Sequence, residues 1–448
     1  MEFFYLYGRK KKAAVATLGC RVNQYETEAM AEKFIAEGYE FVNFQQYADV
    51  YIINTCTVTN MGDKKSRQMI HRARRKNCNA IIAVVGCYSQ IAPDEVSKIE
   101  GVDVVLGTKN KGDVLYWVNK ASRDGKQMVE VSDVLQNKVF EDLNINEYQN
   151  RTRAFLKIQD GCNRFCSYCL IPFARGPVCS KAPDKIIEEV RKLEINNFKE
   201  IILSGIHIAS YGMDINGDWN LLRVLEEIDK IEGIDRVRIG SIDPKFFTED
   251  VIKRMASLKK LCPHFHLSLQ SGCDNTLERM NRSYTTLEYE KVVYQLRNMI
   301  ENVSITTDII VGFPGETEEE FCKTYEFLNK IAFSKIHVFK YSRREGTKAA
   351  NMKLQIDGKV KDERSNKIIE LNEKLERQFM NKFLGNNMDV LYEQKVSGEK
   401  ICYEGYTPNY IKVISDSIKG ENLEGRILNT ELEDVKNGYI QGEIKSFM

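Results

Sequence analysis

Hydrophobic and polar positions along the first hundred residues predict a layered α/β domain. Short, nearly continuous apolar runs occur in AAVATLGC, DVYIINTC and AIIAVVGC, and more polar stretches of helical length lie between them. One helix is expected near residues 26–37, closed by Gly38, and another is expected to open at Pro93. Continuous apolar strands separated by helices are typical of a parallel sheet covered on both faces, so we predict a doubly wound α/β sheet.

A second series of strands and helices begins near Arg153. Its strand candidates are RAFLKIQ, EIILSG, RVRIGS, HFHLSLQ, SITTDIIVG and SKIHVFKY, with helical stretches between them. Six βα units are fewer than the eight of a closed TIM barrel, so we predict an open, partial (β/α)6 barrel. The polar segment that precedes it, from about residue 111 to 150, is expected to be a boundary or cover segment.

After the barrel the pattern changes to one helix and then to short β segments. Residues 364–383 carry apolar side chains at the i, i+4 spacing of a helix that packs on a surface. These side chains are Leu371, Leu375, Phe379 and Phe383. From Gly385 onwards, short β runs separated by glycine-bearing turns predict a small all-β module.

Length and composition limit the classes of protein that remain. A chain of 448 residues is too long for a typical single core, and we predict domains at 10–145, 148–382 and 383–448. With 65 Lys and Arg against 64 Asp and Glu, any contact with nucleic acid must depend on a local basic patch. The start, MEFFYLYGRKKK, is the reverse of a secretory signal, so we expect a cytoplasmic protein. Its twelve cysteines are then expected to be metal ligands or buried thiols.

The strongest chemical signal is the CxxxCxxC pattern in GCNRFCSYCLIPFARG. Cys162, Cys166 and Cys169 supply three thiolates from one short loop. Iron–sulfur clusters are usually held by four thiolates, so a cluster on three keeps one iron open for a small-molecule ligand. The alternative is a zinc site, which needs a fourth ligand, and Cys179 follows ten residues later.

A second set of cysteines occurs at the ends of predicted strands. Cys20, Cys56 and Cys87 close the apolar runs TLGC, INTC and VVGC. Because the carboxyl ends of parallel strands meet at one edge of a sheet, we expect these thiols to lie together. The glycines before Cys20 and Cys87 permit close approach of the backbone to a cluster. The alternative is three buried structural cysteines.

Several motifs follow one another along the chain in a characteristic order. They are TLGCRVNQYETE, INTCTVTNMGDKKSRQ, VVGCYSQ, GCNRFCSYCLIPFARG, LSGIHIASYG, LSLQSGCDNTLERMNR and TDIIVGFPGETEEEF. Over essentially the whole chain they resemble the radical S-adenosylmethionine (SAM) methylthiotransferases, and most closely the bacterial tRNA threonylcarbamoyladenosine enzymes. The CNRFCSYC run differs from the CDNFCTYC form of the isopentenyladenosine enzymes, and CRVNQYETE differs from the CPKNLVDSE form of the ribosomal-protein enzymes. The resemblance implies an N-terminal cluster domain, a radical SAM barrel and a C-terminal TRAM domain.

The resemblance also implies the chemistry. One [4Fe-4S] cluster on Cys162, Cys166 and Cys169 would bind SAM and generate a 5′-deoxyadenosyl radical. An auxiliary cluster on Cys20, Cys56 and Cys87 would hold the sulfur that is methylated and transferred to C2 of N6-threonylcarbamoyladenosine in tRNA. The implied partners are the tRNA and an electron donor such as flavodoxin or ferredoxin.

Three alternatives stay open at this point. The substrate could be isopentenyladenosine tRNA or a ribosomal-protein side chain, or the chain could be a zinc-stabilised RNA-binding protein without catalysis. In the family an Arg usually stands at the position of Cys179. If that Arg helps to hold the substrate, its replacement would weaken binding.

The patterns that predict SAM and RNA contacts are less specific than the cysteine motifs. By similarity of barrel position, SAM-binding residues are expected at the ends of the second, fourth and fifth strands. They are Ser204, Gly205, Ser268, Gln270, Asp308 and Gly312. RNA contacts are predicted on one face of a basic helix and in the TRAM-like GYTPNYIKV segment. They are Lys64, Arg67, His71, Arg74, Arg75, Tyr406 and Tyr410. A solvated charged face is the alternative, and the C-terminal module has more acidic than basic residues.

Overall fold

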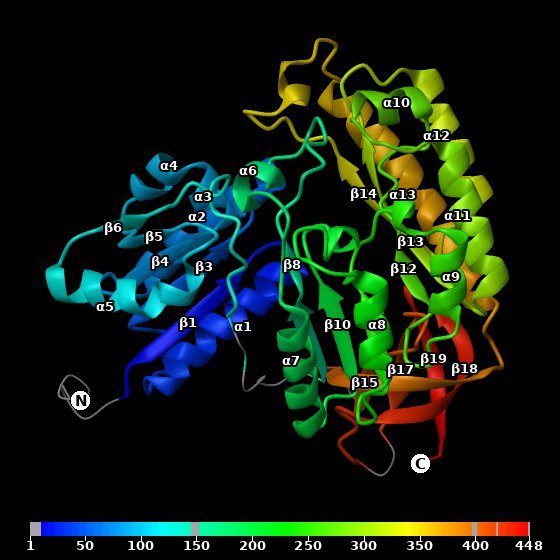
Figure 1. Cartoon of the computed structure of the whole chain (residues 1–448), viewed down its shortest axis with the longest axis horizontal. Helices are drawn as coiled ribbons and strands as arrows, with labels where there is room; N and C mark the ends of the chain where they lie inside the picture. Colours follow the sequence, from blue (N-terminus) through cyan, green and yellow to red (C-terminus); the bar gives the residue numbers. More distant parts are fainter. Residues whose placement is uncertain (1–9, 144, 146–151, 397–400, 418–419, 447–448) are drawn as a thin grey trace.

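The computed structural model of the chain describes residues 10–143, 145, 152–396, 401–417 and 420–446. Residues 146–148, where the boundary between the first two predicted domains falls, and residues 1–9 lie outside the described residues. Three units follow one another along the chain: a parallel α/β sheet, an open βα barrel and a small closed β-barrel (Figure 1). The predicted fold class is confirmed.

The first unit is a six-stranded parallel sheet with the strand order β2-β1-β3-β4-β5-β6. Its strands are β1 (Lys12–Thr17), β2 (Glu40–Phe41), β3 (Val50–Thr55), β4 (Ile81–Gly86), β5 (Val104–Leu106) and β6 (Met128–Glu130). Helices α1 (Arg21–Ala36) and α5 (Val114–Asp124) share an apolar core with one face of the sheet. Helices α2 (Asn60–Lys76), α3 (Cys87–Ile91) and α4 (Pro93–Ser97) cover the other face. Both faces are therefore covered, which explains the continuous apolar strands.

Two expectations about this unit need correction. The first helix begins at Arg21, directly after Cys20, rather than near Glu26. The segment after residue 110 is more than a boundary, because η1 (Lys111–Asp113), α5 and β6 complete the sheet. Val114, Val118 and Ala121 are buried at helical spacing, and the apolar run VLYWV at residues 114–118 was the signal that could have predicted this helix.

The second unit is the open barrel. Its parallel strands are β7 (Arg153–Lys157), β10 (Glu200–Ser204), β11 (Arg236–Ile239), β12 (His264–His266), β13 (Ser304–Val311) and β14 (Lys335–Lys340). They pair as β11-β10-β7 and β12-β13-β14, and isolated bridges such as Val237–Leu261 join the two sheets. The order confirms the predicted partial (β/α)6 barrel, open between β7 and β14.

Helices alternate with these strands. They are α7 (Pro183–Ile195), α8 (Leu221–Asp229), α9 (Glu249–Ala256), α10 (Asp274–Arg279), α11 (Thr286–Met299) and α12 (Glu318–Ile331). The loop after β7 adds β8 (Gln159–Asp160), α6 (Ile171–Arg175) and β9 (Cys179–Ser180). Single turns of 3₁₀ helix occur at η2 (Ile208–Ser210), η3 (Pro244–Phe246) and η4 (Lys348–Asn351).

Helix α13 (Gly358–Asn381) leads from the barrel to the third unit. It begins earlier than predicted because the side chain of Asp357 accepts a hydrogen bond from the Lys359 amide and caps the helix. The third unit closes a five-stranded barrel in the order β15-β16-β17-β19-β18. Its strands are β15 (Asn387–Val396), β16 (Cys402–Tyr406), β17 (Lys412–Asp416), β18 (Ile427–Lys436) and β19 (Tyr439–Ser446). The predicted all-β module is confirmed.

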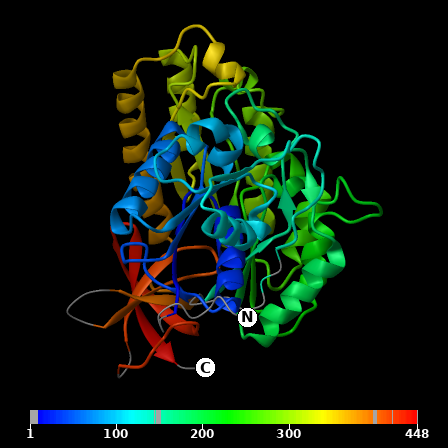
Figure 2. The ribbon, with the colours of Figure 1, turned by 90° about the vertical axis from the view of Figure 1, so that its left-hand side faces the viewer.

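The other two units pack against different sides of the βα barrel. Helix α1 packs against β7, since Tyr25 and Ala154 belong to one apolar core. Figure 2 shows the first unit, in blue, in front of the barrel from that side. The small β-barrel lies at the amino ends of the βα-barrel strands, where Arg236 donates hydrogen bonds to the carbonyls of Tyr406 (3.0 Å) and Asp389 (2.8 Å). None of the described helices is long and apolar enough to cross a membrane.

Candidate functional site

The cysteines that follow β1, β3 and β4 lie together at one edge of the first sheet. Burial, followed by the charge of Cys87 and then that of Cys20, raises the pKa of Cys56 to about 12, so the three thiols interact electrostatically. A Cβ on Gly19 would lie 2.7 Å from the Cβ of Cys56, and the φ of Gly19 is +100°. This turn therefore requires a glycine.

The second trio, Cys162, Cys166 and Cys169, lies in the loop between β8 and α6. The Cys169 amide donates to the Cys166 carbonyl at 3.0 Å and closes a tight turn. Burial, followed by the charge of Cys166 and then that of Cys162, raises the pKa of Cys169 to about 12. The structure thus groups these three thiols as well.

Neither trio is arranged like the ligands of a single ion. Among the described residues, no three His, Cys, Asp or Glu side chains converge on a position that could hold one metal ion. The cysteines of an iron–sulfur cluster bind different iron atoms, so their sulfur atoms need not converge. Two thiol trios on short turns, each with an arginine that donates a hydrogen bond to one sulfur atom, suit such clusters chemically.

Each trio has one largely buried arginine against a thiol. The Nε of Arg175, on α6, donates to the Sγ of Cys87 at 3.3 Å, and the Nη1 of Arg282 donates to the Sγ of Cys166 at 3.4 Å. A guanidinium beside a cysteine stabilises the thiolate, which is the form that binds a metal. Neither arginine is among the predicted site residues, although Arg175 lies near the end of GCNRFCSYCLIPFARG and Arg282 ends LSLQSGCDNTLERMNR.

Arg175 also connects the barrel to helix α1. Its Nη2 donates to Asn23 Oδ1 at 2.5 Å and to Glu26 Oε2 at 3.0 Å, and all of these side chains are buried. Asn23 and Glu26 lie on the helix that follows Cys20, and Arg175 lies on the helix that follows the CxxxCxxC loop. The hydrogen bonds of Arg175 therefore hold this loop in a fixed position relative to the first trio.

Two buried lysines complete this group of charges. Lys157 lies 2.8 Å from Glu26 and 2.7 Å from Asp160, and Lys111 also pairs with Glu26. Although burial opposes it, the charges of Arg175, Lys111 and Lys157 hold the pKa of Glu26 well below its usual value. Arg175, Lys157 and Lys111 therefore surround the carboxylate of Glu26 beside the cysteines, although burial and the charge of Arg175 lower the pKa of Lys111.

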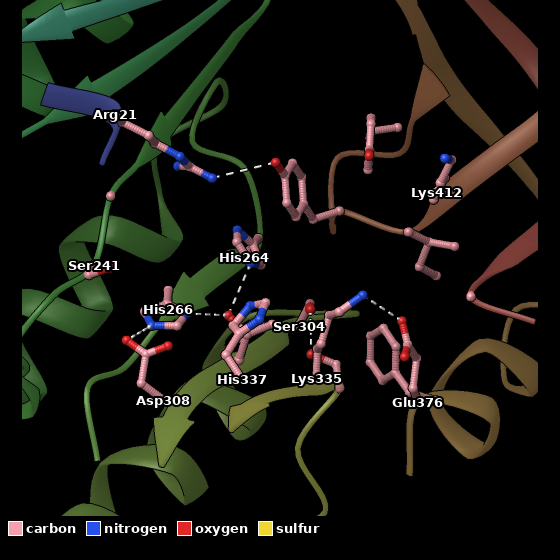
Figure 3. A pocket seen from close by; sticks show the side chains of 18 of the residues that line it. Arg21, Ser241, His264, His266, Ser304, Asp308, Lys335, His337, Glu376 and Lys412 are labelled. Atoms are coloured by element: carbon pink, nitrogen blue, oxygen red, sulfur yellow. Dashed lines mark hydrogen bonds and ion pairs between the residues drawn. The ribbon is translucent and has the colours of Figure 1, made fainter. Parts of the chain in front are cut away.

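A cavity of about 440 Å³ opens where the three units meet. Its wall includes Cys20 and Arg21 from the first unit, residues of β12, β13 and β14, and Tyr410 of the small β-barrel. Figure 3 shows Arg21 entering it from one side, opposite His266 and Asp308. The cavity joins a cysteine of the first trio to the interior of the barrel, so it is the candidate space for a substrate.

Comparisons with known proteins identify the family. Residues 12–107 match the model of Uncharacterized protein family UPF0004, and residues 156–328 match the Radical SAM superfamily. The chain is 42% identical to the threonylcarbamoyladenosine tRNA methylthiotransferase MtaB of Bacillus subtilis, over 96% of this chain and 95% of that protein. It belongs to the radical SAM methylthiotransferase family.

Other relatives of this radical SAM methylthiotransferase are consistent with that assignment. The protein of the same name from Aquifex aeolicus is 43% identical, over 93% of this chain and 100% of the relative. The tRNA-2-methylthio-N(6)-dimethylallyladenosine synthase of Thermoanaerobacter sp. is 34% identical, over 96% of this chain and 92% of the relative. Among solved structures, the radical SAM methyltransferase TsrM of Kitasatospora setae shares the fold, with a TM-score of 0.55, 14% identity, and coverage of 76% of this chain and 77% of that one.

Membership of the superfamily brings SAM and a [4Fe-4S] cluster as cofactors. Three of the six predicted SAM residues, Ser204, Gly205 and Asp308, line the cavity. Asp308 Oδ2 lies 3.1 Å from His266 Nε2. These residues are therefore positioned to meet a ligand inside the methylthiotransferase barrel.

The other three predicted SAM residues, Ser268, Gln270 and Gly312, do not line this cavity. The carbonyl of Ser268 accepts hydrogen bonds from Tyr284 and Arg282, and Gln270 has a positive φ of 75°. A Cβ on Gly312 would lie 2.3 Å from the Cγ of Lys361, so this glycine permits α13 to pack closely.

The predicted RNA-binding residues divide into two groups. On α2, the side chains of Lys64, His71 and Arg75 are exposed, whereas Arg67 pairs with Glu95 at 3.1 Å and Arg74 pairs with Asp103 at 3.6 Å. The exposed three form the part of the basic face that is open to a ligand.

The two tyrosines lie at the interface with the βα barrel. The Tyr410 ring stacks between His264 and Tyr406, with centroid distances of 4.6 Å and 4.8 Å, and Arg238 lies 4.4 Å from its centroid. Both tyrosines line the cavity, and their ring faces contact side chains of this chain rather than open solvent.

Cys179, the candidate fourth zinc ligand, lies in another environment. It is buried on β9, and its thiol accepts a hydrogen bond from Lys109 at 3.4 Å. Burial raises its pKa, followed by the charge of Asp160, while Lys109 and Lys157 oppose the rise. Together with the family assignment, this placement does not favour the zinc alternative.

Proposed function

We propose that the protein adds a methylthio group to C2 of N6-threonylcarbamoyladenosine, the modified adenosine beside the tRNA anticodon. The observation that carries the proposal is the 42% and 43% identity, over nearly the whole chain, to relatives named for threonylcarbamoyladenosine tRNA. A relative named for dimethylallyladenosine is less similar, at 34%. The threonylcarbamoyl substrate is therefore preferred.

Two clusters are proposed. Cys162, Cys166 and Cys169 would hold the cluster that binds SAM, and Cys20, Cys56 and Cys87 would hold an auxiliary [4Fe-4S] cluster. Such clusters supply the one-electron cleavage of SAM and an open iron for the transferred sulfur. The reduction requires a one-electron donor, and we propose a flavodoxin or a ferredoxin.

The chain's own side chains contact the cluster thiols, enclose the substrate base and bind the RNA. Arg175 and Arg282 donate hydrogen bonds to the sulfur atoms of Cys87 and Cys166 and place positive charge beside them. The cavity beside Cys20 is walled by all three units, so a base that enters it is shielded from side reactions with solvent. Lys64, His71 and Arg75 are proposed to contact RNA phosphates.

A gene deletion tests the proposal directly. Mass spectrometry of tRNA nucleosides should show the methylthio mark on threonylcarbamoyladenosine in the parent strain and its loss in the deletion strain. Wild-type protein and a Cys78→Ala variant, which lacks only an exposed cysteine, should both restore it, whereas Cys56→Ala should not. Persistence of the mark in the deletion strain would show that another enzyme makes it and would refute the assignment.

A further inference from the structure

The wall of the cavity includes a largely enclosed arginine, Arg21. Of the cations in this wall, Lys335 pairs with Glu376 at 3.0 Å and Lys412 pairs with Glu404 at 2.5 Å. Arg21, in contrast, forms no ion pair with the residues that the structure describes, and its Nη2 donates to the hydroxyl of Tyr410 at 3.4 Å. A largely enclosed guanidinium that meets only a phenol has unused hydrogen-bonding capacity for an anion.

The imidazole of His264 is a second polar group in the same wall. The Nδ1 atom of His264 is buried and has no hydrogen-bond partner among the described residues, while the residue is 3% exposed. Most buried polar atoms in proteins form a hydrogen bond, so this nitrogen has the capacity for one more partner. Figure 3 shows His264 between Arg21 and His266 in the cavity wall.

A chain of hydrogen bonds defines what this imidazole offers. Asp308 Oδ2 lies 3.1 Å from His266 Nε2, and the Thr306 hydroxyl lies 2.9 Å from His266 Nδ1 and 3.4 Å from His264 Nε2. Burial, followed by the charges of Arg238 and Arg21, lowers the pKa of His264 well below its usual value, so its ring is neutral and carries one proton. In the tautomer with that proton on Nε2, His264 donates to the Thr306 hydroxyl and its Nδ1 is a hydrogen-bond acceptor.

From this geometry we propose that Arg21 binds the carboxylate of the threonylcarbamoyl group, while His264 Nδ1 accepts a hydrogen bond from the same group's hydroxyl or ureido N–H. The inference rests on the proposed function and deepens it, because it names the residues that recognise the modification. A threonylcarbamoyl group carries a carboxylate and hydrogen-bond donors on one short chain. The carboxylate complements the charge of Arg21, and a donor complements His264 Nδ1. Arg21 follows Cys20 directly, so the modification would be held beside the first cysteine trio.

The same pair of residues excludes the competing substrate. An isopentenyl group is apolar, so it would give Arg21 no anion and His264 Nδ1 no hydrogen bond. Sites built to hydrogen-bond a substrate discriminate strongly against analogues that cannot return the bond. Arg21 is therefore a specificity residue, distinct from the cysteines that carry the chemistry.

Binding to four synthetic anticodon stem-loops tests this assignment on the anaerobically reconstituted full chain. They differ at one nucleotide, which is threonylcarbamoyladenosine, its threonyl methyl ester, isopentenyladenosine or adenosine. Wild-type protein should bind the free acid about ten- to a hundredfold more tightly than the ester. In Arg21→Gln the acid and the ester should bind within about twofold of each other. Arg21→Met, apolar and of similar length, replaces the glutamine variant if that variant does not fold.

Controls separate the possible results. Arg123→Gln removes one charge from an exposed site on α5 and should keep the wild-type ratio. A wild-type ratio in Arg21→Gln overturns the inference alone, whereas wild-type protein that ignores threonylcarbamoyladenosine and makes no methylthio product overturns the proposed function. SAM also carries a carboxylate, so SAM affinity is measured in parallel. If Arg21→Gln weakens SAM binding and leaves the RNA ratio intact, Arg21 serves SAM and the inference is wrong.

Discussion

The Nε atom of Arg175 donates a hydrogen bond to the Sγ atom of Cys87 at 3.3 Å, although the two residues belong to different structural units. Arg175 ends helix α6, directly after the CxxxCxxC loop, whereas Cys87 begins helix α3 of the first sheet. The contact therefore ties the two cysteine trios to each other. Arg282 makes the equivalent contact with Cys166, so each trio has one arginine against one thiol.

Replacing Arg175 should destabilise the junction between the units. Arg175→Met removes the donors to Cys87, Asn23 and Glu26 and leaves a buried carboxylate with one cation fewer. Loss of one partner from a buried ionic group costs about 3 kcal/mol, so the free energy of unfolding in urea should fall by about that amount.

An exposed ion pair provides the comparison for this variant. Arg67 pairs with Glu95 on the surface of α2, and the side chains are 40% and 57% exposed. Arg67→Met should therefore change the free energy of unfolding by less than about 1 kcal/mol. Equal losses in the two variants would contradict a structural role for the buried fork of Arg175.

The grouping of cysteines follows a rule that sequence can express. Cys20, Cys56 and Cys87 each end a strand of one parallel sheet, and such ends meet at one edge whatever the details of side-chain packing. The six barrel strands were predicted from short β-rich runs that alternate with helical stretches. That pattern was missed for α5 and β6, which lie within a largely polar segment.

The arginines could not be placed in this way. Whether Arg175 faces a thiol depends on how α6 packs against α3, which are 80 residues apart in the chain and share no local pattern. The sequence motif CRVNQYETE contains Arg21 but gives no sign of its position. Its place in the cavity wall depends on how α1 packs across the open barrel. Tyr406 and Tyr410 fit an aromatic RNA-binding motif, but tertiary packing stacks them on each other, with His264 and Arg238 against Tyr410.

Glycine at position 19 should be required for the first trio. In Gly19→Ala the new methyl would lie 2.7 Å from Cys56 Cβ and 2.8 Å from its Sγ, at a φ of +100° that alanine rarely adopts. Iron bound after anaerobic reconstitution should fall from about eight atoms per chain towards about four, as one cluster is lost. Gly125→Ala is the matched control, because Gly125 also has a positive φ (60°) but no atom lies within 4 Å of the new Cβ. Full iron in Gly19→Ala would show that the turn can rearrange.

The junction between the small β-barrel and the βα barrel contains a carboxylate that is poorly compensated. Glu393 lies 2.7 Å from Arg153, but Arg153 also approaches Glu200 at 3.7 Å and so serves two carboxylates. Burial raises the pKa of Glu393 to about 7; Arg153 opposes the rise and the charge of Glu200 adds to it. The folded protein thus holds a proton at this position more tightly than the unfolded chain does.

This difference makes stability depend on pH. Because the folded pKa lies above the unfolded value of 4.5, the stabilisation is complete below about pH 4.5 and is lost as pH rises through 7. Between pH 5 and pH 8 the wild-type chain should lose about 2 kcal/mol more of its free energy of unfolding than Glu393→Gln, which cannot ionise. Urea unfolding at several pH values measures this difference, and Glu433→Gln, at an exposed position of the same barrel, should follow the wild-type curve. If wild type and Glu393→Gln have parallel pH profiles, Glu393 is ionised throughout and the Arg153 pair outweighs its burial.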